Sequence, residues 1–158
     1  MAVSANALFL GIDSVYGANT LGLMARDMIG EGVTTEAGLV VSERGSGGNM
    51  SVDVAAGSCW VEGTEDATQP TYRVDAGSVT TLGVTSAHAS LDRIDLVVVR
   101  VADSAFSGTA DEAVIEVIAG TPHASPSVPS TPDNALPLAK IAVGDPRAEG
   151  VRRFGFSG

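Results

Sequence analysis

The order of apolar and polar positions predicts one helix near the start of the chain. From Asn19 or Thr20, either of which can cap a helix, apolar residues recur at spacings of three and four until Gly30 and Gly32 end the pattern. The recurring residues are Leu21, Met24, Ala25, Met28 and Ile29. Before them, the short apolar run at residues 7–11 is closed by turn-forming residues and predicts a strand or an extended arm.

Beyond the glycine-rich break at residues 45–49, the period of the pattern falls to two and predicts strands. Residues 50–54 and 58–62 alternate, and in the second run Cys59 and Val61 share one face. Two further runs rich in β-branched residues, 72–75 and 79–85, are separated by Ala76, Gly77 and Ser78, which predicts a hairpin.

The strongest strand signal is the run at residues 94–101, which is apolar on both faces except for Asp95 and Arg100. Residues 113–118 predict a second strong strand that pairs antiparallel with it, and residues 138–143 predict a closing strand. Between them, residues 121–137 hold five of the seven prolines, so we expect an extended, polyproline-like crossing along the surface.

Together these elements predict a mostly β fold, an antiparallel β-sandwich with a short N-terminal helix and an extended proline-rich crossing segment. We expect three parts. Residues 1–44 form an arm and helix for oligomerisation or anchoring, residues 45–143 form the sandwich domain, and residues 144–158 form a docking tail.

Composition narrows the classes of function. A chain of 158 residues with 44% hydrophobic and 18% charged residues is expected to fold around one core. Its net charge of −10 repels polyphosphates, so we expect no nucleic-acid partner. Cys59 is the single cysteine, which excludes an internal disulfide framework. The apolar run at residues 7–10 is too short to span a bilayer, so neither membrane insertion nor a secretion signal is expected.

A catalytic reading of the sequence has one candidate. His88 and Asp92 lie close to Ser86 and Ser90, and a nucleophilic hydroxyl needs such a base and such an acid. No nucleophile-elbow motif accompanies them, and a polar turn before a strand accounts for the same residues. We therefore predict no catalytic residues and no enzyme activity.

A metal-binding reading is weaker still. Asp103, Ser107, Gly108 and Asp111 resemble a calcium loop only in part, because Ala105 and Val114 stand where two ligands are needed. The glycine run at residues 45–48 lacks the lysine of a phosphate loop. We predict no metal site and no cofactor.

Two sets of residues carry structural predictions. Arg93 and Asp95 lie two apart on one face of a strand, which predicts a structural ion pair, with a subunit contact as the alternative. The helix residues Leu21, Met24, Met28 and Ile29 pack either on their own sheet or against the same helix of neighbouring copies.

Several motifs resemble minor tail and baseplate (tail-tip) proteins of tailed bacteriophages. The order and spacing of these motifs carry the resemblance, which covers most of the chain. They are residues 6–11, 50–54, 56–57, 60–63, 93–101, 114–118, 120–122, 124–126 and 136–143.

The resemblance implies a virion protein of a tail tip, baseplate or fibre base, assembled in the host cytoplasm as a homotrimer with other phage structural proteins as partners. The low lysine content suits a phage of a GC-rich, actinobacterial host. Many such proteins continue into a fibre or receptor-binding head, whereas this chain ends at Gly158, so we expect an anchoring, plugging or decorating role. Arg147, Arg152 and Arg153 are expected to dock on an acidic neighbouring subunit.

Two other functions stay open on the sequence alone. A head decoration or head-fibre protein can share this size and composition. A receptor-binding module for host cell-surface glycan needs aromatic platforms, and only 4% of the residues are aromatic, with Trp60 the single tryptophan.

Overall fold

The computed structural model describes residues 18–44, 50–106, 110–144 and 155–157, and these form a mostly β fold with three antiparallel sheets and one short helix. The elements are α1 (Ala18–Met28), β1 (Gly32–Val33), β2 (Val41–Glu43), β3 (Ser51–Val54), β4 (Gly57–Glu62), β5 (Thr71–Ala76), β6 (Thr80–Gly83), β7 (Arg93–Ala102), β8 (Glu112–Ile118), β9 (Ala135–Val143) and β10 (Gly155–Ser157). The predicted mostly β class and the predicted helix are confirmed.

The largest sheet has four strands in the order β10-β9-β7-β8. Its central strand β7 is buried along most of its length, as expected for a run that is apolar on both faces. β8 pairs antiparallel with β7, with Val97 opposite Val117, which confirms the predicted pairing. β7 therefore lies between two antiparallel neighbours, β8 and β9.

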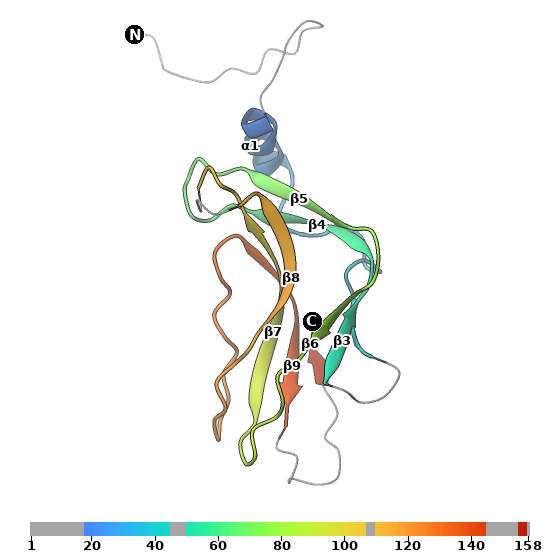
Figure 1. Cartoon of the computed structure of the whole chain (residues 1–158). Helices are drawn as coiled ribbons and strands as arrows, with labels where there is room; N and C mark the ends of the chain where they lie inside the picture. The colour runs from blue at the N-terminus through green and yellow to red at the C-terminus, as the bar shows by residue number, and fades with distance from the viewer. Residues whose placement is uncertain (1–17, 45–49, 107–109, 145–154, 158) are drawn as a thin grey trace, which may run out of the picture.

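The two three-stranded sheets follow one another around a corner of the chain, and together we call them the bent sheet. β4 pairs with β5 and β3 pairs with β6, and the chain passes from β3 to β4 through Ala55 and Ala56 alone. Gly57 lies at this bend, where a Cβ would come within 2.6 Å of the Gly38 backbone. Figure 1 shows β4 and β5 crossing over the top of β7, with β3 and β6 turned down beside it.

The predicted hairpin between residues 72–75 and 79–85 is wrong. β5 and β6 are both strands, but β5 pairs with β4 and β6 pairs with β3. Residues 77–79 carry the chain around the outside of the bend and do not fold it back on itself. The physical reason is that one long ribbon changes direction here, so a short glycine-containing connection marks a corner.

The N-terminal part contributes to the bent sheet. β1 pairs with β4, with Val33 opposite Cys59, and β2 pairs with β3, with Val41 opposite Val54. The N–H of Ala55 donates to the carbonyl of Val40 at 2.9 Å and joins the two halves of this edge. Residues 32–43 thus pair with strands of the predicted sandwich domain.

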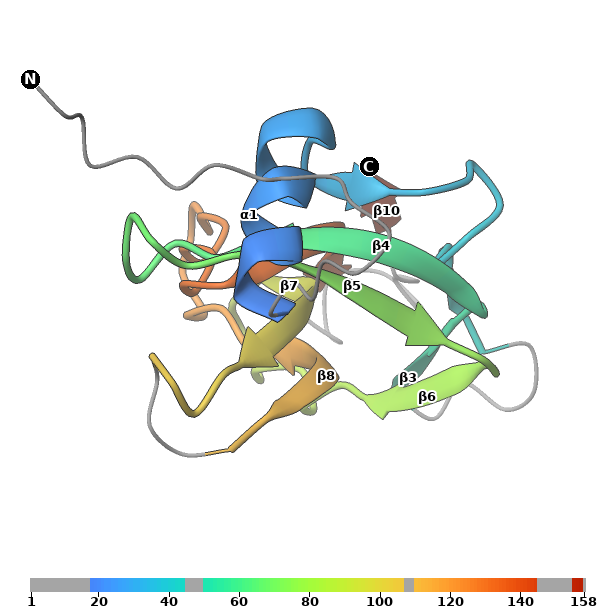
Figure 2. The same cartoon turned by 90° about the horizontal axis from the view of Figure 1, so that it is seen from above.

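The hydrophobic core lies where the bent sheet meets the four-stranded sheet. The fully buried apolar side chains of this core are Val52, Val54, Cys59 and Val61 from the bent sheet, and Val97, Val99 and Ile141 from the four-stranded sheet. Figure 2 shows the same arrangement from above, with α1 lying over β4 and β5. The core supports β4 and β5, which in turn carry the helix.

The proline-rich segment holds no strand from residue 119 to residue 134, apart from one bridge between Asp92 and His123. Residues 121–133 are exposed or half-buried, as a surface segment should be. Pro137 was predicted to close this crossing, but it lies inside β9, which begins at Ala135. The pairing of β7 with β9 shifts register between Val97 and Val98, so Pro137 lies at an irregularity where a missing N–H is tolerated.

Candidate subunit-contact surface

Helix α1 is held on the rest of the chain by one polar and small-residue face. Arg26 pairs with Glu62 at 3.1 Å and donates from Nη1 to the carbonyls of Ala67 and Gln69, each at 3.0 Å. Gly22 lies directly against Pro70, where a Cβ would overlap the proline ring. The helix therefore rests on the β4–β5 loop through hydrogen bonds, an ion pair and one close backbone approach.

Three apolar residues of α1 face away from that contact. At about 100° per residue, Leu21, Met24 and Met28 lie roughly 140° around the helix from Gly22 and Arg26. These three side chains, here called the helix stripe, are 47%, 38% and 73% exposed. Ile29, just beyond the helix, is 38% exposed. Two alternatives were predicted for these residues. In the described part of the chain their side chains are exposed and are not packed on their own sheet.

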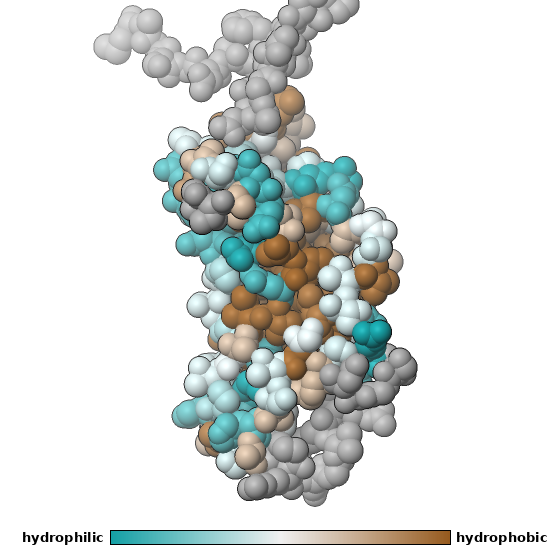
Figure 3. Space-filling view, viewed as in Figure 1, coloured by the Kyte–Doolittle hydropathy of each residue, from teal (hydrophilic) through white to brown (hydrophobic). Residues whose placement is uncertain are grey.

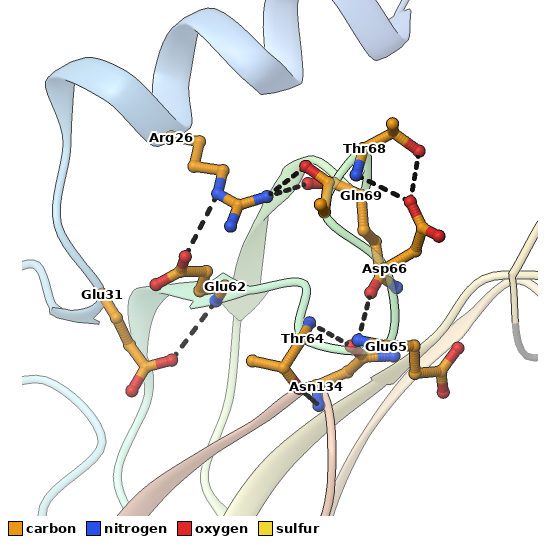
Figure 4. A network of polar contacts seen from close by, with 10 residues as sticks. Arg26, Glu31, Glu62, Thr64, Glu65, Asp66, Thr68, Gln69 and Asn134 are labelled. Carbon is orange, nitrogen blue, oxygen red and sulfur yellow. Dashed lines mark hydrogen bonds and ion pairs between the residues drawn. The ribbon is translucent and has the colours of Figure 1, made fainter.

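A network of polar contacts fixes the loop on which α1 rests (Figure 4). Asn134, at the start of β9, accepts a hydrogen bond from the N–H of Thr64 at 2.8 Å and returns one from its own N–H to the Thr64 hydroxyl at 2.9 Å. Gln69 accepts from the N–H of Glu65 at 2.9 Å. Asn134 and Gln69 are fully buried, so these bonds satisfy groups that water cannot reach.

Further contacts of this network tie the loop to itself and to the start of β1. Asp66 accepts from the N–H and the hydroxyl of Thr68 at 2.7 and 2.6 Å, and these two bonds lower the pKa of Asp66. Glu31 accepts from the N–H of Glu62 at 3.3 Å. The loop under α1 is thus held by hydrogen bonds to Asn134, to its own residues and to Glu31.

The predicted ion pair between Arg93 and Asp95 is confirmed. Its two side chains are 4% and 0% exposed, with Nε 2.8 Å and Nη2 3.2 Å from the carboxylate oxygens. Arg93 also donates to the carbonyls of Ser86 and Thr85, and Asp95 accepts from the N–H of Gly120 at 2.9 Å. The pair therefore joins the start of β7 to two loops, the one that precedes β7 and the one that follows β8.

The residues of the triad hypothesis have local contacts. His88 Nδ1 accepts from the N–H of Ser90 at 3.3 Å, while Asp92 forms a backbone bridge with His123. The ring of His123 accepts from the N–H of Ser125 at 3.0 Å. These are the contacts that turns ahead of a strand make.

The carboxylates of the calcium-loop hypothesis cap their own loop. Asp103 accepts from the N–H of Ala105 at 2.8 Å, and Asp111 accepts from the N–H of Ser104 at 2.7 Å. In the part of the chain that the structure describes, no group of three or more His, Cys, Asp or Glu side chains is placed to hold a metal ion.

A groove that sequence reasoning missed opens between β5 and the β7–β8 connection. Its volume is about 390 Å³, and we call it the acidic groove because Asp103, Asp111 and Glu112 line it. The other lining residues are Tyr72, Arg73, Val74, Val101, Ala102 and Ala113. Figure 3 shows apolar surface on this side of the molecule, below polar side chains at the upper end. No local motif predicts the groove, because its walls come from three separate stretches of chain.

The Tyr72 side chain is fixed within this groove. Its hydroxyl donates to Asp103 at 2.8 Å and accepts from Gln69 at 3.2 Å. Desolvation, followed by the bond to Asp103, raises the pKa of Tyr72 to about 12. A second hollow of about 380 Å³ lies on another side, where β9 approaches β1 and β2, and it includes the exposed Val33 and Val40.

The remaining predicted contact residues, Arg147, Arg152 and Arg153, lie outside the described residues. Among the helices that the structure describes, α1 included, none has the length and apolar character needed to cross a membrane. Comparison of the chain with protein-family models, curated protein sequences and solved structures finds no match.

Proposed function

We propose that this chain is a non-enzymatic structural protein of a bacteriophage virion, placed at a tail tip, baseplate or fibre base. It acts by assembling with copies of itself, as a trimer, and by attaching to neighbouring phage subunits. The observation that carries the proposal is the outward direction of the helix stripe on a helix that is otherwise anchored. The sequence motifs shared with phage tail proteins supply the setting.

The spacing of the helix stripe suits contact between parallel helices. Leu21, Met24 and Met28 follow the alternation of three and four residues that lines the seam of a coiled coil. Each copy contributes three apolar side chains to the seam. Three helices packed around one axis would therefore cover nine side chains.

The energy available from the helix stripe sets the strength of that contact. Its exposed surface amounts to about one and a half side chains per copy, whose burial yields about 2–5 kcal/mol. Association costs about 4–15 kcal/mol in lost translational and rotational freedom. The helices alone would thus form a weak trimer, and stable assembly needs a second contact or the high local concentration of a virion.

In this proposal the sheets hold α1 in a fixed position for the subunit contact. We interpret the bent sheet and the four-stranded sheet as the two layers of a β-sandwich, with the shared core between them. The buried network around Gln69 and Asn134 connects these sheets to the loop under α1. A mechanical role of this kind requires a stable shape and no bond-breaking step.

Sedimentation equilibrium over a range of protein concentrations tests the assembly. We expect the wild-type chain to show reversible trimer formation and Met24→Glu to raise the dissociation constant by about tenfold or more, since each buried charge costs several kcal/mol. Val128→Glu is a matched control, because Val128 is 38% exposed like Met24 and lies in the proline-rich segment. A wild-type chain that stays monomeric at millimolar concentration would rule out the assembly.

The place in the virion has its own test. An antibody against the chain should label one end of the tail in electron micrographs of intact particles. Labelling spread over the capsid would assign the chain to head decoration and overturn the tail assignment.

A further inference from the structure

We propose that the acidic groove of one copy binds the arginine-bearing segment 145–154 of a second copy, in a head-to-tail contact. This inference rests on the proposed function, because it names a second contact of the same homo-oligomer.

The chemistry of the acidic groove suits arginine. Its floor is apolar, with Val74, Val101 and Ala113, and can cover the methylene stem of an arginine side chain. The Asp111 carboxylate stands beside that floor, where it can accept hydrogen bonds from a guanidinium.

Two features prepare the groove for a cation. The Tyr72 ring is fixed by the bonds of its hydroxyl to Asp103 and Gln69, and it offers a face on which a guanidinium can stack. The Asp111 carboxylate is held ionised, because the N–H of Ser104 bonds to it and lowers its pKa.

The charge of the chain is unevenly distributed. Of its 19 acidic residues, all but Asp13, Asp145 and Glu149 lie in the described part, which holds six of the nine basic residues. Four of those six, Arg26, Arg73, Arg93 and Arg100, already pair with carboxylates within the chain. Segment 145–154 carries the other three, Arg147, Arg152 and Arg153, against two acidic residues. It is therefore the complementary partner for an acidic surface.

Chain length prevents the segment from reaching the groove of its own copy. Val143 lies opposite Arg93 and Gly155 lies opposite Ala142, so both ends of the segment are fixed at the N-terminal end of β7. The groove lies beyond Val101, at the other end of β7, which is about 30 Å away at the rise of a strand.

The three arginines are close in sequence to these fixed ends. Arg147 is three residues from Gly144, Arg152 is three from Gly155 and Arg153 is two, so their Cα atoms lie within about 11 Å of an anchored residue. A fully extended arginine side chain added to this reach still falls short of the groove at the other end of β7. The groove that these arginines can occupy belongs to another copy.

The resulting contact is heterologous, with the lower end of one copy against the upper end of the next (Figure 1). It uses surfaces separate from the helix stripe. The head-to-tail contact is the second interaction that the weak helix contact requires.

Disulfide trapping tests the contact with full-length chains. Ala113→Cys places a thiol in the groove and Val151→Cys places one beside Arg152, and neither removes a charge. The native Cys59 does not interfere, because it is fully buried. We expect a disulfide-linked dimer when the two variants are mixed and oxidised, and none from either variant alone.

A matched control replaces the groove variant with Ala89→Cys, an exposed alanine near the N-terminal end of β7. It should give no linked dimer with Val151→Cys. Linking by a single variant alone, or equal linking by the control, would overturn the head-to-tail contact.

Charge reversal provides a second measurement. Asp111→Lys, added to Ala113→Cys, should slow linking by about tenfold, and Arg152→Glu on the other copy should restore much of the rate. Circular dichroism checks that each variant is folded. Unchanged linking after reversal, or no recovery in the combination, would reject the charge pairing.

The result separates this inference from the proposed function. If linking persists in a Met24→Glu background, the head-to-tail contact stands without the helix contact. If the wild type forms trimers sensitive to Met24→Glu but the mixture never links, the helix contact stands and the groove inference falls. Groove variants that fail to enter particles, without any linking between copies, would mean that a basic segment of another virion protein fills the groove.

Discussion

Removing Asp95 should destabilise the fold more than any other single charge deletion that we propose. The Asp95 side chain is fully buried, and its carboxylate accepts from Arg93 and from the N–H of Gly120. Asp95→Ala leaves a buried guanidinium without its counter-ion and the half-buried N–H of Gly120 without an acceptor. Breaking a buried pair in this way costs about 3–5 kcal/mol.

That loss is large against the stability of a domain. Folded domains are stable by about 5–15 kcal/mol, so the variant should lose about a fifth or more of its free energy of unfolding. At about 2–4 °C per kcal/mol for a chain of this size, the melting temperature should fall by about 6–20 °C. Urea unfolding followed by circular dichroism measures the free energy, and differential scanning calorimetry measures the temperature.

Two control variants test whether the loss of stability in Asp95→Ala comes from the burial of the ion pair. Arg73→Ala breaks the Arg73–Asp75 pair, whose side chains are 53% and 56% exposed, and should cost at most about 1 kcal/mol. Replacing both members, with Arg93→Met and Asp95→Leu, should be milder than Asp95→Ala, because no charge stays buried. It should still cost about 1–3 kcal/mol, since the N–H of Gly120 loses its acceptor. A loss below 1 kcal/mol in Asp95→Ala would refute the account of a buried, mutually dependent pair.

Three further outcomes are expected. Burial, with smaller contributions from Asp75 and Glu31, raises the pKa of the Cys59 thiol to about 11, so a thiol reagent at pH 8 should label it only after unfolding. Because the unfolded thiol ionises first, the urea midpoint should fall as pH rises from about 9 toward 11, which a pH series would check against Cys59→Ala. Gly120→Ala should lower the melting temperature markedly, since a Cβ there overlaps the carbonyl oxygen of Ile94. Asn134 has a φ of 54°, so Asn134→Gly, which keeps that conformation and loses only the side-chain bond, should melt above Asn134→Ala.

Periodicity predicted those elements whose burial is decided locally. β7 is apolar on both faces in sequence and is buried between two strands in the structure. α1 shows its period of three and four residues and ends within two residues of Gly30. The Arg93–Asp95 pair followed from two-residue spacing, because side chains two apart on a strand share a face.

The local sequence pattern did not predict which strands pair with one another. Residues 76–78 have the composition of a tight turn, yet they lie beside a corner at which β5 leaves β4 and β6 joins β3. The corner is set by close backbone packing of Gly57 on Gly38, and these glycines are nineteen residues apart. A turn and a corner have the same residue types, so composition does not separate them.

The buried polar residues show the same limit at longer range. Gln69 and Asn134 are residue types that are common in surface loops. Both are buried here, where the β4–β5 loop meets the start of β9. The Thr64–Asn134 exchange joins residues 70 positions apart. No periodic signal marks such a pair, so the platform under α1 was missing from the sequence prediction.

The direction of α1 depends on this platform. An amphipathic pattern indicates that a helix has an apolar side, and the usual result is burial of that side on its own domain. Here Gly22 permits close approach to Pro70, and Arg26 finds two carbonyls and Glu62 on the same loop. Polar bonds therefore fix the helix by its opposite side, and the helix stripe is left facing outward. A helix held in this manner keeps its apolar residues available for a partner without giving up its own position, which is the property that a subunit contact requires.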